Sequence, residues 1–225
     1  MSTITITKPS ALLHITGRDL KALFGSVLPH TSDDPDGLPA LQEVHVEIHD
    51  GDLRLVCTDR FTMAVVRRPM TSTTEAFSCR FALPVRDIRD LIEHLDDVAI
   101  ASLAFEENRL FVTTEDSAHN IPGSASVLGW RDLLNRVLKP SGTPVGRILI
   151  DPTFLARLEP AKRLNEDAPL VIQMQGEHGA VVATLGASFL ALVMPMTSRS
   201  MREDLLPSRP LDGWFDLLDE TDAPA

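Results

Sequence analysis

Apolar and polar residues alternate along several short stretches of the chain, a pattern typical of half-buried β-strands. The clearest stretches are 44–48 and 53–66, joined at 50–51 by Asp-Gly, a dipeptide that favours a tight hairpin turn. Thr-Asp-Arg at 58–60 interrupts the second stretch, and Thr and Asp side chains commonly hydrogen-bond local backbone groups. We therefore expect two successive hairpins, with residues 60–63 held at the end of a sheet, where side chains can line a groove.

Three further stretches carry apolar residues at the spacing of one helix face, starting near residues 16, 84 and 151. Leu20, Ile88 and Leu155 occupy equivalent positions in them, 68 and 67 residues apart. Strand patterns surround these helices at 11–15, 44–48, 53–57, 61–66, 77–83, 98–105, 110–114, 119–124, 147–150, 169–175, 180–185 and 189–194. The near-equal spacing indicates an internal repeat of three β-α-β-β-β half-units. Each helix would cover one face of an antiparallel sheet, which is an α+β arrangement.

This repeat predicts how the chain is divided. We expect a domain of two half-units at 1–127, a connector at 128–146, a lone half-unit at 147–196 and a flexible tail at 197–225. The tail is acidic, because it holds seven Asp or Glu residues against three arginines.

Composition limits the class of protein. The chain has 225 residues, 44% of them apolar, and a mean hydropathy of +0.03, which is typical of a soluble globular protein. No run approaches the roughly 18 apolar residues of a membrane span, and the N-terminus lacks signal-peptide features, so we expect a cytoplasmic protein without a membrane partner. The net charge of −11 argues against binding nucleic acid with the whole surface, but it is compatible with a local basic face.

Motifs for catalysis are missing from the sequence. It contains no P-loop, dinucleotide fingerprint, nucleophile elbow or paired zinc motif, so we expect neither an enzyme nor a cofactor. Cys57 and Cys79 lie on separate expected strands and indicate buried thiols rather than a disulfide or zinc site. His45, Glu47 and His49 share one strand face, where a metal site is conceivable, but a solvent-exposed face is the favoured interpretation.

Four stretches together point to one family. They are LQEVHVEIHDGDLRLVCTDRFTM at 41–63, FALPVR at 81–86, GWRDLL at 129–134 and the segment 146–196, which ends in VMPM. They resemble the bacterial DNA sliding clamp, the β subunit of DNA polymerase III, and the Thr-Asp-Arg-Phe turn is similar to that of actinobacterial members. The resemblance covers about residues 11–196. It implies a DNA-clamp fold.

A clamp of this family has three domains, or six half-units, and two chains close into a ring around duplex DNA. Three half-units are recognisable here, so a ring would need a homo-oligomer of more than two chains, and four chains would again total twelve half-units. The alternative is an adaptor or decoy that binds the clamp motifs of partner proteins without encircling DNA.

Polymerases and repair proteins insert a short linear peptide into a hydrophobic pocket of the family clamp. The resemblance places this pocket at Leu41, Thr58, Arg60, Phe61, Thr62, Met63, Leu128, Asp132, Leu133, Leu192, Met194, Pro195 and Met196. Leu, Phe and Met side chains offer adaptable apolar walls for a peptide. The alternative interpretation is that these are ordinary core and turn residues. Thr62 and Asp132 stand where many clamps have basic residues, so we expect a weaker preference for acidic peptides. Substituting Phe61 or Met63 is expected to abolish peptide binding and leave the fold largely intact.

The helices of a family clamp line the ring and contact DNA phosphates. The resemblance implies that the DNA-facing residues here are Arg18, Lys21, Arg86, Arg89 and Arg157. Asp90 and Glu93 share the exposed face of the second helix, so ordinary surface charge is the alternative interpretation.

The acidic tail contains a compact hydrophobic motif formed by Trp214, Phe215, Leu217 and Leu218. The motif resembles the short peptides that clamps bind. We hypothesise that it docks into the pocket of this chain, of a neighbouring chain or of a host clamp, and the alternative is a disordered acidic tail.

Overall fold

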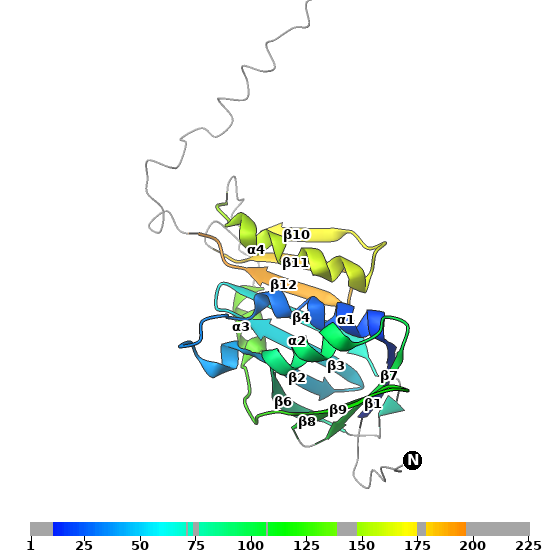
Figure 1. Ribbon diagram of the computed structural model, residues 1–225. Helices are drawn as coiled ribbons and strands as arrows, with labels where there is room; N and C mark the ends of the chain where they lie inside the picture. Colours follow the sequence, from blue (N-terminus) through cyan, green and yellow to red (C-terminus); the bar gives the residue numbers. More distant parts are fainter. Residues whose placement is uncertain are drawn as a thin grey trace, which may run out of the picture.

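Two antiparallel β-sheets form the framework of the protein, and helices pack against them (Figure 1). The computed structural model describes residues 11–70, 72–73, 77–106, 108–138, 148–174 and 179–196. Within these ranges a five-stranded sheet has the order β5 (Ser72–Thr73), β1 (Ala11–Thr16), β7 (Ile100–Glu106), β8 (Arg109–Thr113), β9 (Ala118–Pro122). A seven-stranded sheet has the order β10 (Leu170–Met174), β11 (Val181–Leu185), β12 (Phe189–Val193), β4 (Thr62–Pro69), β3 (Asp52–Thr58), β2 (Glu43–His49), β6 (Cys79–Pro84). The expected α+β class with antiparallel sheets is confirmed.

Helices α1 (Gly17–Gly25) and α2 (Val85–His94) lie along one face of the seven-stranded sheet (Figure 1). Thr16 begins α1 as its N-cap, because its Oγ1 accepts a 3.1 Å hydrogen bond from the backbone N–H of Asp19. Leu20 of α1 and Ile88 of α2 are fully buried in the main core. Burying a side chain of this size contributes about 2 kcal/mol, so the apolar stripes fix both helices on the sheet.

The strands that precede α1 and α2 each pair outside their own expected half-unit. β1 precedes α1 but pairs with β7, with Leu13 opposite Leu103. β6 precedes α2 but pairs with β2, with Val46 opposite Phe81. Each of the two sheets is therefore completed by a strand from the other part of the chain.

The last segment of the chain extends the seven-stranded sheet. β12 pairs with β4, and Leu192 lies opposite Met63. This pairing joins strands that are more than 120 positions apart in the sequence. It brings together two of the segments that the resemblance names as pocket walls.

The third half-unit differs from its expected form. Residues 148–150, the described part of the strand expected at 147–150, form no regular strand. The expected helix is only α4 (Pro152–Ala156), which Asp151 caps, followed by the 3-10 helix η3 (Glu159–Leu164). Pro160 explains the break, because proline inside a helix removes a hydrogen bond and clashes with the preceding turn.

Residues 128–146 were expected to be a connector, but they contain helix α3 (Trp130–Val137). Two short 3-10 helices, η1 (Leu28–His30) and η2 (Pro39–Leu41), complete the described elements. None of the described helices is long and apolar enough to cross a lipid bilayer. The tail residues Trp214, Phe215, Leu217 and Leu218 lie outside the described residues.

Candidate functional site

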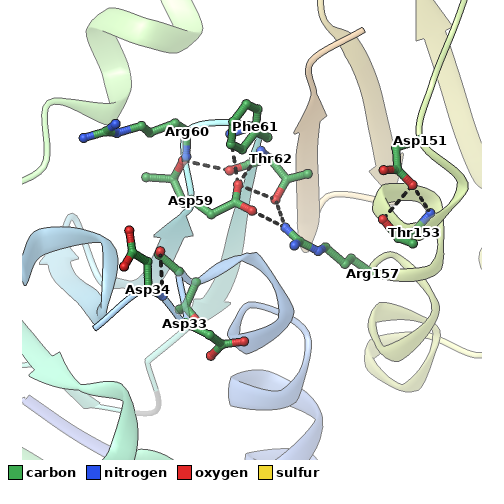
Figure 2. Close-up of polar contacts among 12 residues, drawn as sticks. Asp33, Asp34, Asp59, Arg60, Phe61, Thr62, Asp151, Thr153 and Arg157 are labelled. Carbon is green, nitrogen blue, oxygen red and sulfur yellow. Dashed lines mark hydrogen bonds and ion pairs between the residues drawn. The ribbon is translucent and has the colours of Figure 1, made fainter. Parts of the chain in front are cut away.

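The turn between β3 and β4 is held by the side chains of Thr58 and Asp59. Thr58 Oγ1 donates a 2.7 Å hydrogen bond to the carbonyl of Thr62, and Asp59 Oδ1 accepts from the backbone N–H groups of Phe61 and Thr62 at 3.0 and 2.7 Å. Arg60 has a φ of 80°, a left-handed conformation that costs a non-glycine residue about 1 kcal/mol. Its side chain points away from Asp59 (Figure 2). These bonds maintain the strained turn and leave the Arg60 side chain open to solvent.

Asp59 also connects this turn to the segment that follows α4. Arg157 donates one hydrogen bond to Asp59 Oδ2 and a second, of 2.9 Å, to Thr62 Oγ1 (Figure 2). Burial alone would raise the pKa of the Asp59 carboxyl, but hydrogen bonds from Arg157 and Thr62 outweigh it, so the pKa is lowered. The carboxylate is therefore charged at neutral pH, and it ties the third half-unit to the first.

His30 lies fully buried near this ion pair. Burial, together with the positive charge of Arg157, lowers the pKa of His30 to about 4. Neither ring nitrogen has a hydrogen-bond partner among the described residues. His30 is therefore neutral at physiological pH, when Asp59 and Arg157 are both charged.

Two apolar side chains are exposed beside the turn. Phe61 is 59% exposed and stacks on the ring of Phe154 of α4, with 6.0 Å between the ring centroids. Met194 is 39% exposed, and its backbone N–H donates to the Phe61 carbonyl at 2.8 Å. This bond places the end of β12 next to the β3–β4 turn, so an apolar surface forms where the two segments meet.

A second apolar cluster covers the face of the seven-stranded sheet opposite to α1 and α2. Side chains alternate between the two faces of a strand, so Ala64 and Val66 of β4 belong to the main core while Met63 and Val65 face the other way. We call this second group the outer-face cluster. Its buried members are Val56, Met63, Val65, Ala180, Val182 and Leu192, and the partly buried Leu128, Trp130, Leu133, Leu134, Val137 and Leu190 pack against them.

Helix α3 provides the cover of the outer-face cluster. Trp130, Leu133, Leu134 and Val137 have the i, i+3, i+4, i+7 spacing of one helix face, and this face lies on the sheet. The hollow beside Leu128 and Trp130 holds only about 10 Å³. The chain therefore covers its outer-face cluster with its own helix.

Glu47 of β2 holds the start of α3. Its carboxylate is 4% exposed and contacts three arginines: Arg54 at 2.9 Å, Arg80 at 3.2 Å, and Arg131 of α3. Burial would raise the pKa of Glu47, but the hydrogen bonds from Arg131 and Arg54 lower it to about 2. A single buried carboxylate is thus contacted by three cations at this position.

The interpretation of β2 as a solvent-exposed or metal-binding face is therefore wrong for two of its three polar residues. His45 is buried, and its Nε2 lies 2.8 Å from the carbonyl of Ala40. The Glu47 carboxylate forms ion pairs with Arg54 and Arg131. Only His49, at the strand end, is exposed, and it lies 3.2 Å from Asp50. The strand is buried on both faces because Leu128 and α3 cover the side that was expected to face solvent.

The structure brings together most of the residues that the resemblance assigns to the peptide pocket. Met63, Leu128, Leu133 and Leu192 belong to the outer-face cluster, and the β3–β4 turn supplies Thr58, Arg60, Phe61 and Thr62. Met194, Pro195 and Met196 follow β12, and Asp132 is exposed on α3. Leu41 is buried in η2 and is not part of the outer-face cluster among the described residues.

Four further residues belong to this region although they were not assigned to the pocket from the sequence. Trp130, Leu134 and Val137 contact the outer-face cluster from α3, and Phe154 stacks on Phe61. The helical spacing of the first three was readable in the sequence. Proline and glycine residues follow this segment in the sequence. They favoured a connector, so a helix was not predicted there.

Most of the cations proposed to face DNA lie in ion pairs. Arg18 contacts Glu166 at 2.8 Å, Lys21 contacts Asp97 at 2.7 Å, Arg89 contacts Asp33 at 3.2 Å, and Arg157 contacts Asp59. Arg86 is exposed at the start of α2. The helix face is therefore close to electrically balanced at these positions.

Comparison with known proteins identifies the fold. Neither a protein-family model nor a curated protein matches the sequence. Among solved structures, a putative DNA polymerase III β subunit from Eubacterium rectale aligns with 88% of this chain and 68% of its own, at 10% identity and a TM-score of 0.66. The sliding clamp from Bacillus subtilis aligns with 88% of this chain and 66% of its own, at 13% identity and a TM-score of 0.66. The Pseudomonas aeruginosa clamp bound to griselimycin aligns with 89% and 69%, at 17% identity and a TM-score of 0.58.

The aligned region spans about two thirds of the length of these clamps. The similarity was expected from the order of the turn, the Trp-Arg segment and the Met-Pro-Met end, and the shared structure confirms it. The chain has the fold of the bacterial DNA sliding clamp, the β subunit of DNA polymerase III.

Proposed function

We propose that this protein acts as a sliding-clamp-like tether in DNA replication or repair, and that it binds partner proteins through the surface between the β3–β4 turn and the end of β12. The observation that carries the proposal is the pairing of Met63 with Leu192. It makes neighbours of two segments that resemble the walls of the clamp peptide pocket.

The chemistry of this surface suits an extended apolar peptide. Phe61 and Met194 lie just beyond the paired ends of β4 and β12, each two positions from the buried Met63 and Leu192. Both are exposed, whereas Met63 and Leu192 beneath them are buried. An exposed aromatic ring beside a flexible thioether is typical of surfaces that accept short peptides.

Helix α3 limits how deep a peptide can enter. Its apolar residues are only partly buried, but they occupy the sheet face beside Met63. A bound peptide would lie across Phe61 and Met194 and against the exposed edge of α3, where Asp132 would disfavour an acidic peptide. Deeper insertion requires α3 to shift.

Contact with duplex DNA is the second part of the proposal. The resemblance to the sliding-clamp family implies a non-catalytic protein that encircles DNA as an oligomer. The alternative is a monomeric adaptor or decoy, and it is favoured by the ion pairs that neutralise most cations on the helix face. Light scattering of the purified protein separates the two, because a monomer of this size cannot surround a duplex. An oligomer retained on circular DNA but released after linearisation supports the ring.

Peptide binding is tested with a fluorescent peptide carrying a polymerase clamp-binding motif. We expect the unchanged chain to bind it and Met194→Asp to weaken binding at least tenfold. Val98→Asp is the matched control, because Val98 is 81% exposed and lies before β7, on the other sheet. Equal binding by the unchanged chain and Met194→Asp would exclude this surface.

A further inference from the structure

The free edge of the seven-stranded sheet carries an apolar hollow that the proposed peptide site does not use. The hollow measures about 330 Å³ and is lined by the apolar Leu155, Leu158, Ala161, Ala168, Leu170 and Leu185 and by the charged Glu159 and Lys162. α4 and η3 form one wall and the strands β10 and β11 the other. Figure 1 shows α4 beside β10 at the end of the sheet farthest from β6.

Strand β10 lacks the features that protect edge strands. One of its edges pairs with β11, and the other has no partner strand within the described residues. Its sequence, LVIQM, contains no charge and no proline, and Leu170, Val171, Ile172 and Met174 are each 43–50% exposed. Edge strands in soluble proteins usually carry charges or prolines or are covered.

Strand β7 occupies the position in the preceding part of the chain that β10 occupies here, and it is covered. β7 is the first strand after α2, as β10 is the first strand after α4. β7 is covered on its outer side by β1, and its alternate residues Leu103 and Phe105 are fully buried. The apolar composition of β10 therefore indicates a covered strand.

We propose that the chain's own C-terminal segment 211–218 covers the hollow beside β10. Wound as an α-helix, this segment would present Leu211, Trp214, Phe215 and Leu218 on one face, because they stand at i, i+3, i+4 and i+7. The acidic residues Asp212, Asp216 and Asp219 would then face solvent. Four large apolar side chains on one face match an apolar hollow with two charged residues in its lining.

The exit of the chain from the sheet favours this occupant. The backbone N–H of Met196 donates to the carbonyl of Leu149 at 2.9 Å, two positions before Asp151, which caps α4. Met196, the last described residue, therefore lies close to α4, the helix that carries Leu155 into the hollow. Fourteen residues separate Met196 from Leu211 and reach up to roughly 50 Å, so the distance is no obstacle. A covalently attached segment also acts at a high effective concentration.

Segment 211–218 has more room in the hollow beside β10 than on the outer face of the sheet. α3 already covers the outer-face cluster with Trp130, Leu133, Leu134 and Val137. The hollow beside β10 is open and about 330 Å³. The inference concerns a surface separate from the proposed peptide site and stands whether or not that site binds peptides.

Hydrogen exchange of the full chain and of a chain ending at residue 204 tests the proposal. We expect amides of α4, η3 and β10 to exchange at least tenfold faster after the truncation, and added peptide 207–222 to restore the slow rate. The double substitution Trp214→Ala with Phe215→Ala should match the truncation. Leu217→Ala is the matched control, because Leu217 would lie off the apolar face of the proposed helix.

Substitutions on the receiving side complete the test. Leu155→Asp and Leu170→Asp should reproduce the fast exchange, and both residues are partly exposed, so the fold tolerates them. Exchange rates unaffected by the truncation would overturn the proposal. So would protection that grows with protein concentration, which would identify a second copy as the cover. Loss of protection in Phe61→Ala but not in Leu155→Asp would place the tail in the peptide site instead.

Discussion

Arg157 and Asp59 are 98 positions apart and form a hydrogen-bonded ion pair between the third half-unit and the β3–β4 turn (Figure 2). The same guanidinium bonds Thr62 and lies 5.1 Å from the ring centre of Phe154. The resemblance assigned Arg157 to DNA, but in the structure this side chain connects two parts of the protein. The turn that exposes Phe61 depends on this connection.

Arg157→Ala should lower the free energy of unfolding by about 2 kcal/mol, because it leaves the buried carboxylate of Asp59 without its charged partner. Chemical denaturation measures the loss. Arg18→Ala is the control, since its ion pair with Glu166 is exposed, and it should cost less than about 0.5 kcal/mol.

A double-mutant cycle with Asp59→Asn isolates the pair. Because either substitution removes the same interaction, the double variant should be destabilised by less than the sum of the two single variants. Strict additivity would show that the two side chains act independently.

Glu47 makes the stability of the protein depend on acid pH. Its pKa lies at about 2 in the folded chain, against 4.5 for the free side chain. Stabilisation by the charged carboxylate is therefore complete above about pH 4.5 and is lost as pH falls toward 2. Glu47→Gln should cost about 2 kcal/mol at pH 7, detach α3 first and flatten the pH dependence below 4.5.

Denaturation of Glu47→Gln at several pH values, beside the exposed control Glu93→Gln, measures this effect. Trp130 lies at the start of α3, so in a Trp214→Phe background tryptophan fluorescence reports whether the helix leaves the sheet. Identical pH profiles for the two variants would contradict the role of Glu47.

His30 should produce a separate pH effect at higher pH. Its pKa is about 4 in the folded chain against 6.5 when free, so between these values the unfolded chain binds a proton that the folded chain does not. The free energy of unfolding should then fall by roughly 2 kcal/mol as pH drops from 6.5 to 4. His30→Leu removes the titrating group and should be flat in this window. A slope that persists in this variant would assign the effect to another group.

The sequence was sufficient for the strands of the seven-stranded sheet and for α1 and α2, because hydrophobic alternation and helix stripes are local signals. It was insufficient where the partner is distant. The sequence around Glu47 does not predict that three arginines contact its carboxylate, because one of them, Arg131, lies 84 positions away on α3. Similarly, Arg157 alone on its helix looks like surface charge, and only the fold brings it to Asp59.

The sequence predicted only part of the proposed peptide site, because the burial of its residues depends on elements that are distant in the sequence. Family resemblance could name Phe61 and Met194, but whether each is exposed depends on the covering elements. α3 was not expected, so the sequence could not show that it buries Met63. The strands that pair Met63 with Leu192 were expected, but their pairing across the sheet was not.

Phe61 and Met63 should respond differently to substitution, contrary to the expectation that either would give a folded protein without binding. Met63 is 1% exposed, so Met63→Asp buries a charge beside Leu192 and should unfold the sheet junction. Phe61 is 59% exposed, so Phe61→Ala loses mainly its stacking on Phe154, about 1 kcal/mol. Phe61→Ala should therefore remain folded by circular dichroism and bind the fluorescent clamp-motif peptide at least tenfold more weakly. Phe61→Leu keeps an apolar side chain and should recover most of the affinity, whereas equal affinity in Phe61→Ala and the unchanged chain would remove Phe61 from the site.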